Sequence, residues 1–171
     1  MVKVIGIDPG LASTGIGIVS GKGLHIQNYS YGSIHTSSTN ALPHRLNQIY
    51  SQLHLILSTE VPDLMVVEDV FILDKFPRSG IVLGKVCGII LLAGALQNIP
   101  ILEIPVREAK QVLTGNGNAS KSQLEKSVRS RLALTVPIKP DHASDALGLA
   151  MIGLFRHHDA PRMAQALPGV R

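Results

Sequence analysis

The chain has 171 residues, a length that fits one compact domain better than two. Hydrophobic residues make up 45% of it and tryptophan is missing, so a core of Val, Ile, Leu and Ala is expected, as in α/β proteins. The net charge of +4 favours an acidic partner such as a nucleic acid, without excluding an ordinary enzyme.

The location of the protein is predicted from its cysteine content and its apolar segments. Cys87 is the single cysteine, so no intrachain disulfide can form and the reducing cytoplasm is expected. Asp8 interrupts the N-terminal apolar run before it reaches the length of a signal-peptide core. The longest apolar stretch, residues 86–96, is too short to cross a bilayer. Neither secretion nor membrane insertion is expected.

The first half of the chain predicts strands followed by a helix. Residues 2–7, 15–20 and 25–34 are β-type runs separated by glycine-containing turns, as in an antiparallel meander. From residue 40 to about Glu60, apolar residues recur at spacings of three and four, the stripe of an amphipathic helix. Residues 64–67 form a short apolar run typical of a central strand buried on both faces.

The next segment predicts a loop and an unusually apolar helix. Residues 69–80 read as a loop, and residues 81–97 as a helix that is apolar nearly all round. Such a helix is either buried in the core or covered by another subunit. Residues 101–104 follow as a further strand.

The C-terminal part predicts three more helices. A short helix over residues 106–113 ends before a Gly-Asn-Gly break at 115–117, and Ser120 with Gln123 forms a capping box that begins the next helix. Pro137 and Pro140 mark a linker. Asp141 is expected as the N-cap of the last helix, which runs through residue 154. One domain is therefore expected over residues 1–158, and residues 159–171 are expected to be a flexible tail.

Four residues are candidates for chemistry: Asp8, Glu68, His142 and Asp145. Asp8 and Glu68 each close a predicted strand, and ligand sites in α/β sheets gather where strands end. His142 and Asp145 lie three residues apart, which places them on one face of a helix. Clustered carboxylates repel one another, and Mg²⁺ or Mn²⁺ relieves that repulsion. Two such ions can hydrolyse a phosphodiester without a covalent enzyme intermediate.

Each candidate also has a structural interpretation. Asp8 with the following Pro and Gly could be an ordinary turn, and Asp145 could complement the helix dipole. His142 could be a surface or core histidine. An acid that closes a buried apolar strand, as Glu68 does, is harder to explain by packing alone.

The order of these motifs resembles the RuvC family of Holliday-junction resolvases over roughly residues 2–157. The motifs that carry the resemblance are Gly6-Ile7-Asp8-Pro9-Gly10 with Thr14-Gly15, Glu68 with Val70-Phe71, Gly115-Asn116-Gly117 before Lys121, and residues 145–150 in the last helix. The first motif alone also occurs in actin-like phosphate loops, and it is the order of all four that makes the match specific.

The resemblance implies the fold, the activity and the partners. It implies a ribonuclease H-like α/β fold, a mixed five-stranded sheet with helices on both faces. It implies a homodimer that makes paired, metal-dependent incisions in strands of like polarity at four-way DNA junctions, using two Mg²⁺ or Mn²⁺ ions per site. The branch-migration complex RuvA–RuvB is the implied protein partner.

Asp8, Glu68 and Asp145 take the family's metal-binding positions. At the fourth position many members carry Asp, whereas this sequence has His142, with Asp141 one place earlier. Alignment by helix register gives the role to His142, and direct binding by Asp141 is the alternative.

The resemblance also implies DNA contacts. Lys110 and Lys121 match phosphate-contacting positions, and Phe71 matches an aromatic residue near the junction crossover. Solvated surface lysines and a core phenylalanine are the alternatives. Phe76 and Arg78 occupy a loop expected to face DNA, although the segment 73–80 departs from the common family pattern.

Three other functions are alternatives to a junction-cutting nuclease. An actin-like phosphotransferase would need a second phosphate loop and a second domain, and the sequence shows neither. A module that only binds branched DNA gains nothing from clustered acids. A nuclease of the same fold that acts on RNA ends is the third alternative.

Overall fold

The protein folds around a mixed five-stranded sheet, seen in a computed structural model that describes residues 1–69 and 77–157. The strand order is β3-β2-β1-β4-β5. The strands are β1 (Val2–Asp8), β2 (Ser13–Lys22), β3 (His25–His35), β4 (Leu64–Asp69) and β5 (Ile101–Pro105). Strands β1, β2 and β3 pair antiparallel, and β4 is parallel to both β1 and β5. The predicted meander and central strand are therefore confirmed.

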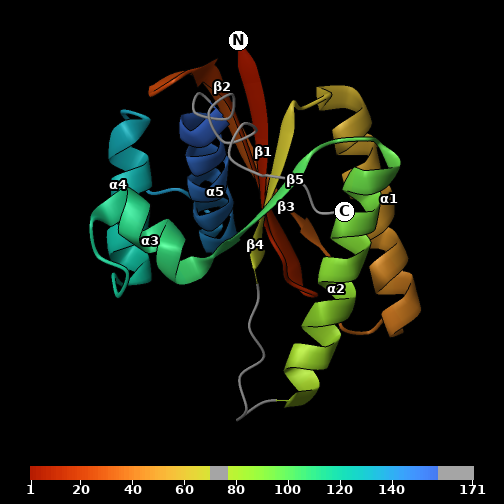
Figure 1. The fold of residues 1–171 in the computed structure, drawn as a ribbon. Helices are drawn as coiled ribbons and strands as arrows, with labels where there is room; N and C mark the ends of the chain where they lie inside the picture. Colours follow the sequence, from red (N-terminus) through yellow and green to blue (C-terminus); the bar gives the residue numbers. More distant parts are fainter. Residues whose placement is uncertain (70–76, 158–171) are drawn as a thin grey trace, which may run out of the picture.

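Helices cover both faces of this sheet (Figure 1). Helices α1 (Leu42–Glu60) and α2 (Pro77–Leu96) lie on one side, and α3 (Val106–Thr114), α4 (Lys121–Arg131) and α5 (Asp141–His157) lie on the other. Successive side chains of a strand point to opposite faces, so β1 feeds two cores. Val4 packs in the core on the α5 side, whereas Ile5 and Ile7 pack in the core on the α1 side.

Helix α5 lies directly on the backbone of β1 and β2 because glycines face it. A Cβ added to Gly6 would overlap the carbonyl oxygen of Ala146, and one added to Gly15 would overlap the carbonyl oxygen of His142. Strand residues with side chains at these positions would hold the helix further from the sheet. The glycines therefore bring the first turn of α5 next to the end of β1.

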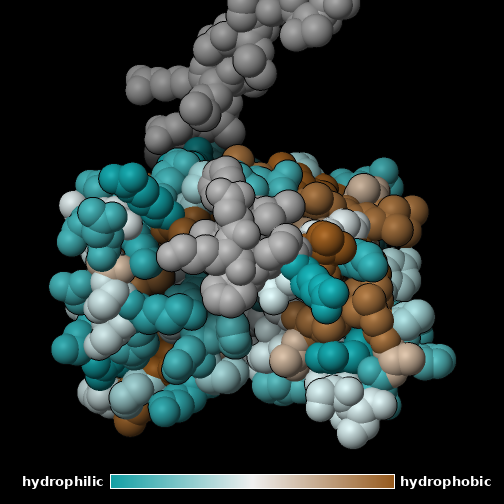
Figure 2. All heavy atoms as spheres, turned by 90° about the horizontal axis from the view of Figure 1, so that it is seen from below, coloured by the Kyte–Doolittle hydropathy of each residue, from teal (hydrophilic) through white to brown (hydrophobic). Residues whose placement is uncertain are grey.

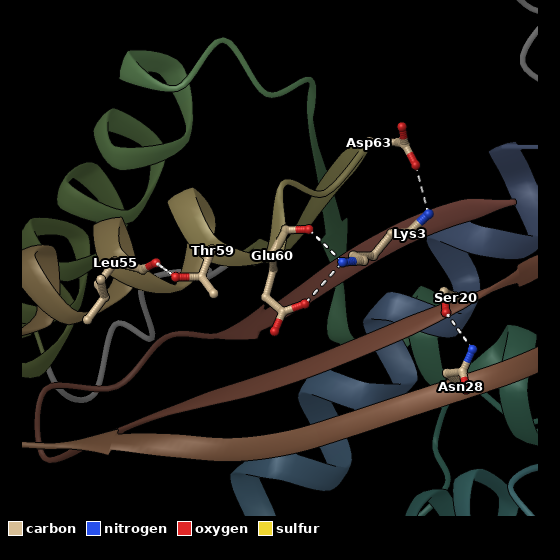
Figure 3. A network of polar contacts seen from close by, with 7 residues as sticks. All are labelled: Lys3, Ser20, Asn28, Leu55, Thr59, Glu60 and Asp63. Carbon is tan, nitrogen blue, oxygen red and sulfur yellow. Dashed lines mark hydrogen bonds and ion pairs between the residues drawn. The ribbon is translucent and has the colours of Figure 1, made fainter.

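The opposite end of β1 is anchored by Lys3 (Figure 3). Its ammonium donates to the carbonyl oxygen of Glu60 at 2.7 Å and lies 3.1 Å from the carboxylate of the same residue. Its backbone N–H donates to Asp63 Oδ2 at 2.8 Å. These contacts tie β1 to the end of α1 and to the start of β4, and so hold two of the strands that end at the candidate site.

Two predicted boundaries are wrong. Helix α2 begins at Pro77, four positions before the expected start, so Arg78 belongs to its first turn and not to a loop. Asp141 is the first residue of α5 and not its N-cap. The N–H of Ala143 donates to the carbonyl oxygen of Pro140, so Pro140 is the residue just before the helix and Asp141 is its first residue. Phe71, Phe76 and the predicted tail lie outside the described residues.

Helix α2 also corrects the expectation drawn from the length of the apolar stretch. The window Arg78–Leu96 has 19 residues and a mean hydropathy of 2.0, so among the described residues this one helix is long and apolar enough to cross a membrane. Only 22% of the window is buried, and Ile81, Leu92 and Leu96 are more than half exposed. Figure 2 shows hydrophobic residues gathered on the side of the molecule that carries α1 and α2. One such helix is weak evidence for a membrane, and its apolar face is open to a partner.

Candidate active site

The four predicted residues lie at one end of the sheet, where β1 and β4 finish and α5 begins. Asp8 ends β1, and Glu68 lies near the end of β4, the parallel neighbour of β1. Parallel neighbours finish at the same edge, so both carboxylates lie there. The first turns of α5 bring His142 and Asp145 to that edge, because Gly15 of β2 touches the backbone of His142.

Two of the acids make close contacts with cationic or ionisable partners. His142 Nδ1 lies 2.5 Å from Asp8 Oδ2, and because an ionised carboxylate only accepts, the ring nitrogen donates this hydrogen bond. Lys121 Nζ, at the start of α4, lies 3.6 Å from Asp145 Oδ2. Asp8 is only 7% exposed, whereas 41% of the His142 side chain is exposed, so their hydrogen bond is partly buried.

The pKa values of all three carboxylates are raised. The pKa of Glu68 rises to about 7, first because the side chain is buried and then because Asp8 and Asp145 place negative charge beside it. Burial also raises the pKa of Asp145, with a further contribution from Asp8. Burial raises the pKa of Asp8 against the opposing effect of its hydrogen bond from His142. The three acids therefore form one electrostatic cluster.

Both predicted lysines lie close enough to influence this cluster. The positive charges of Lys121 and Lys110 lower the pKa of Glu68 in opposition to the neighbouring acids. Arg78 lines a cavity of about 420 Å³ together with Leu11, three residues after Asp8. The structure therefore brings Lys110 and Lys121 to the acids and places Arg78 beside the loop that follows Asp8.

The two candidate positions, 141 and 142, differ in what their side chains contact. His142 is bonded to Asp8, and its charge acts on the pKa values of both Asp8 and Asp145. Asp141 does not affect these groups and is exposed at the first position of α5. Helix spacing does not explain the difference, because positions 141 and 145 are also neighbours on the helix surface. The difference comes from the sheet, because the backbone of His142 lies against Gly15, the β2 residue that pairs with Asp8.

The donor set suits a divalent cation. Three desolvated carboxylates and an imidazole are ligands that Mg²⁺ or Mn²⁺ accepts, and a cation would relieve the mutual repulsion of the acids. Within residues 1–69 and 77–157, no three His, Cys, Asp or Glu side chains are preassembled as a metal site. Asp8 and Asp145 are instead held by His142 and Lys121, so cation binding requires these side chains to rearrange.

Two supporting features were not predicted from the sequence. The Thr14 hydroxyl is buried and donates to the carbonyl oxygen of Gly10 at 2.8 Å, which fixes the turn after Asp8. The Lys121–Asp145 ion pair joins α4 to α5. The Thr-Gly dipeptide after the first strand was a signal for the turn, but no sequence spacing indicates which acid a lysine on another helix will contact.

The chain is similar to known proteins over most of its length. The family model for "Crossover junction endodeoxyribonuclease RuvC" matches residues 4–153. The Carboxydothermus hydrogenoformans protein of that name is 39% identical, covering 91% of this chain and 97% of its own. The Brevibacillus brevis protein of that name is 37% identical, covering 88% and 90%.

A solved structure gives the same result for the fold. Thermus thermophilus RuvC in complex with Holliday junction substrate is 27% identical, with a TM-score of 0.86, and the match covers 94% of this chain and 97% of that one. This likeness confirms the predicted ribonuclease H-like fold. The match of the family model over nearly all described residues, together with relatives near 40% identity, shows that the chain belongs to the RuvC family of crossover junction endodeoxyribonucleases.

Proposed function

We propose that this protein resolves four-way DNA junctions by paired, divalent-metal-dependent hydrolysis of phosphodiester bonds. The observation that carries the proposal is the cluster of Asp8, Glu68 and Asp145, three buried or half-buried carboxylates whose pKa values are all raised. A fold gains no stability from acids held in this way, so their arrangement favours a role in cation binding.

In this proposal Asp8, Glu68, His142 and Asp145 hold Mg²⁺ or Mn²⁺, with two ions in each site. The cations supply an activated water and stabilise the leaving oxygen of the cleaved phosphodiester. Asp8 and Asp145 already lie at the edge where such ions would be needed, and the 2.5 Å bond from His142 orients the imidazole toward the same place. Glu68 closes the cluster from the neighbouring strand.

The basic residues would bind the DNA backbone. The Lys121 side chain is 71% exposed and lies 3.6 Å from Asp145, so its ammonium is within reach of a phosphate bound at the acids. Lys110 approaches the cluster from α3. Arg78 lies at the start of α2, and together with Phe71 and Phe76 it is proposed as a contact to the junction.

A homodimer would cover the apolar face of α2. The exposed residues Ile81, Leu92 and Leu96 lie along this helix, and water contact with so much apolar surface is unfavourable. Two copies of the site are also what paired incisions require. A cytoplasmic location and work with the RuvA–RuvB branch-migration complex remain predictions from the lone cysteine and from family membership.

A cleavage assay tests the proposed function. A synthetic four-way junction, a linear duplex and a single-stranded RNA are each incubated with the protein in Mg²⁺ or Mn²⁺. Wild type should cut the junction at paired positions and leave the other substrates intact. Asp8→Asn should bind the junction without cutting it, and Glu103→Gln, an exposed acid on β5, should cut like wild type. Preferential cutting of RNA, or full activity of Asp8→Asn, contradicts the proposal.

A further inference from the structure

A groove lined by lysine side chains adjoins the candidate active site. This groove, of about 410 Å³, runs between α4 and the linker that leads into α5. Lys121 and Asp145 of the candidate site line it together with Lys126, Pro137 and Lys139. A strand whose phosphate lies at Asp145 therefore has this groove as a continuous path along the surface.

The charges that line the groove are not balanced locally. Glu125 already has partners within the protein. Its carboxylate lies 3.0 Å from Arg129 Nε and accepts a hydrogen bond from the N–H of Ile138 at 3.1 Å. Lys126 and Lys139 are both exposed, and neither forms an ion pair with a carboxylate in residues 1–69 and 77–157. Asp141 is the exposed acid that opposes them.

The wall of the groove is held in place from both sides. Arg129 Nη1 donates to the carbonyl oxygen of Thr135 at 3.1 Å, and Glu125 fixes Ile138, whose side chain is 1% exposed. The linker that carries Lys139 is thus tied to α4, which carries Lys126. Ammonium groups that extend from a fixed support lose less conformational freedom when they bind a ligand.

We infer that this groove binds the phosphodiester backbone of the DNA strand next to the cleaved phosphate, with Lys126 and Lys139 as contacts that contribute affinity and not chemistry. The inference rests on the proposed function, because the strand is placed by its scissile phosphate at Asp145. Phosphate is the ligand that two unpaired ammonium groups beside a surface groove recognise best.

The test measures binding and cutting separately. Dissociation constants for a four-way junction are measured by fluorescence anisotropy in the Asp8→Asn background at several salt concentrations. Each lysine that contacts a phosphate adds about 0.9 to the slope of log affinity against log salt, which corresponds to about eightfold in affinity at 0.1 M salt. Lys126→Gln with Lys139→Gln should therefore weaken binding roughly sixtyfold at that concentration and lower the slope by about 2.

Matched variants separate a specific contact from a general loss of charge. Lys22→Gln removes the same charge at the far end of β2, where Gly21 pairs with Val2, and should change affinity much less. Asp141→Asn should tighten binding, because it removes the acid that faces the groove. With an otherwise wild-type chain at saturating protein, the double lysine variant should cut the junction at a rate within about twofold of wild type.

The outcomes distinguish the inference from the proposed function. If wild type cuts junctions but the double lysine variant binds as tightly as wild type, or no more weakly than Lys22→Gln, the groove is not a phosphate site. A lower cutting rate at saturation would assign the lysines to catalysis and also overturn the inference. If wild type cuts no junction at all, the proposed function fails first.

Discussion

Replacing Glu68 by glutamine should make the metal-free protein more stable at alkaline pH while it abolishes cleavage. The carboxyl group of Glu68 has a pKa of about 7 in the folded chain, against an ordinary value of 4.5. The folded state binds the proton of Glu68 more tightly than the unfolded state does. The contribution of Glu68 to the free energy of unfolding is therefore fully present below about pH 4.5 and is lost as pH rises to about 7.

The size of the effect follows from the two pKa values. Ionising Glu68 in the folded protein costs about 3 kcal/mol at pH 8 and about 1 kcal/mol at pH 5, at 1.36 kcal/mol for each pH unit between the two values. Glutamine resembles the protonated acid in shape and carries no charge. Glu68→Gln should therefore gain about 2 kcal/mol more at pH 8 than at pH 5, which for a chain of this size raises the Tm difference by roughly 4 to 8 °C.

Thermal unfolding followed by circular dichroism in the presence of a chelator measures this difference. Glu103→Gln is the matched control, since it makes the same substitution at an exposed position of β5, the strand next to β4. Its effect should be small at both pH values. Addition of Mn²⁺ should stabilise wild type more than Glu68→Gln, because the variant lacks one of the proposed ligands.

The reasoning is refuted if Glu68→Gln changes the Tm equally at pH 5 and pH 8. That result would mean that Glu68 is solvated in the folded state and does not share charge with Asp8 and Asp145. A variant that is destabilised at pH 8 but not at pH 5 would show that the ionised carboxylate makes a favourable contact in the metal-free protein.

Three further substitutions test the metal preference, the packing of α5 and the proposed dimer. Imidazole is a softer ligand than carboxylate, so wild type should cut faster with Mn²⁺ than with Mg²⁺. His142→Asp should reduce the ratio of the Mn²⁺ rate to the Mg²⁺ rate, and an unchanged ratio would argue against direct metal binding by His142. Gly15→Ala should lower the free energy of unfolding by about 3 kcal/mol or more, because the added Cβ would overlap the His142 backbone and overpacking costs about 1–3 kcal/mol. Gly32→Ala is the control, because the space around Gly32 is open, and it should change the free energy of unfolding little. Chemical denaturation measures both variants. Leu92→Glu places a charge on the exposed face of α2 and should convert a dimer to a folded monomer in sedimentation measurements, and a dimer that survives it would exclude this face.

The sequence predicted most of the elements because their patterns are local. The spacing of apolar residues predicted α1, and the capping box at Ser120 and Gln123 forms as expected, with both reciprocal hydrogen bonds present. The start of α2 was misplaced because Pro77 and Arg78 were read as loop residues, although proline is well suited to the first turn of a helix. Asp141 was misassigned by one position, because the carbonyl oxygen of Pro140 accepts the first hydrogen bond of the helix.

The site was predictable in composition but not in its internal pairing. Asp8, Glu68 and Asp145 follow from where strands end and which helix faces them, together with the family motifs. The bond from His142 to Asp8 and the ion pair of Lys121 with Asp145 depend on the close contact between α5 and β2 and on the packing of α4 against α5. These contacts join residues far apart in the chain, so no local pattern encodes them.

The charge cluster that weakens the metal-free fold also makes cation binding depend on pH. A proton and a divalent cation compete for Glu68, and near pH 7 the proton occupies about half of the sites in the absence of metal, since the pKa is about 7. Cleavage at limiting metal should therefore fall as pH drops below about 7, and a higher metal concentration should restore it. An acid outside the cluster would titrate near its ordinary value and give no loss until a much lower pH. If excess metal failed to shift the acid limb of the profile, proton binding at Glu68 would not be what limits the reaction.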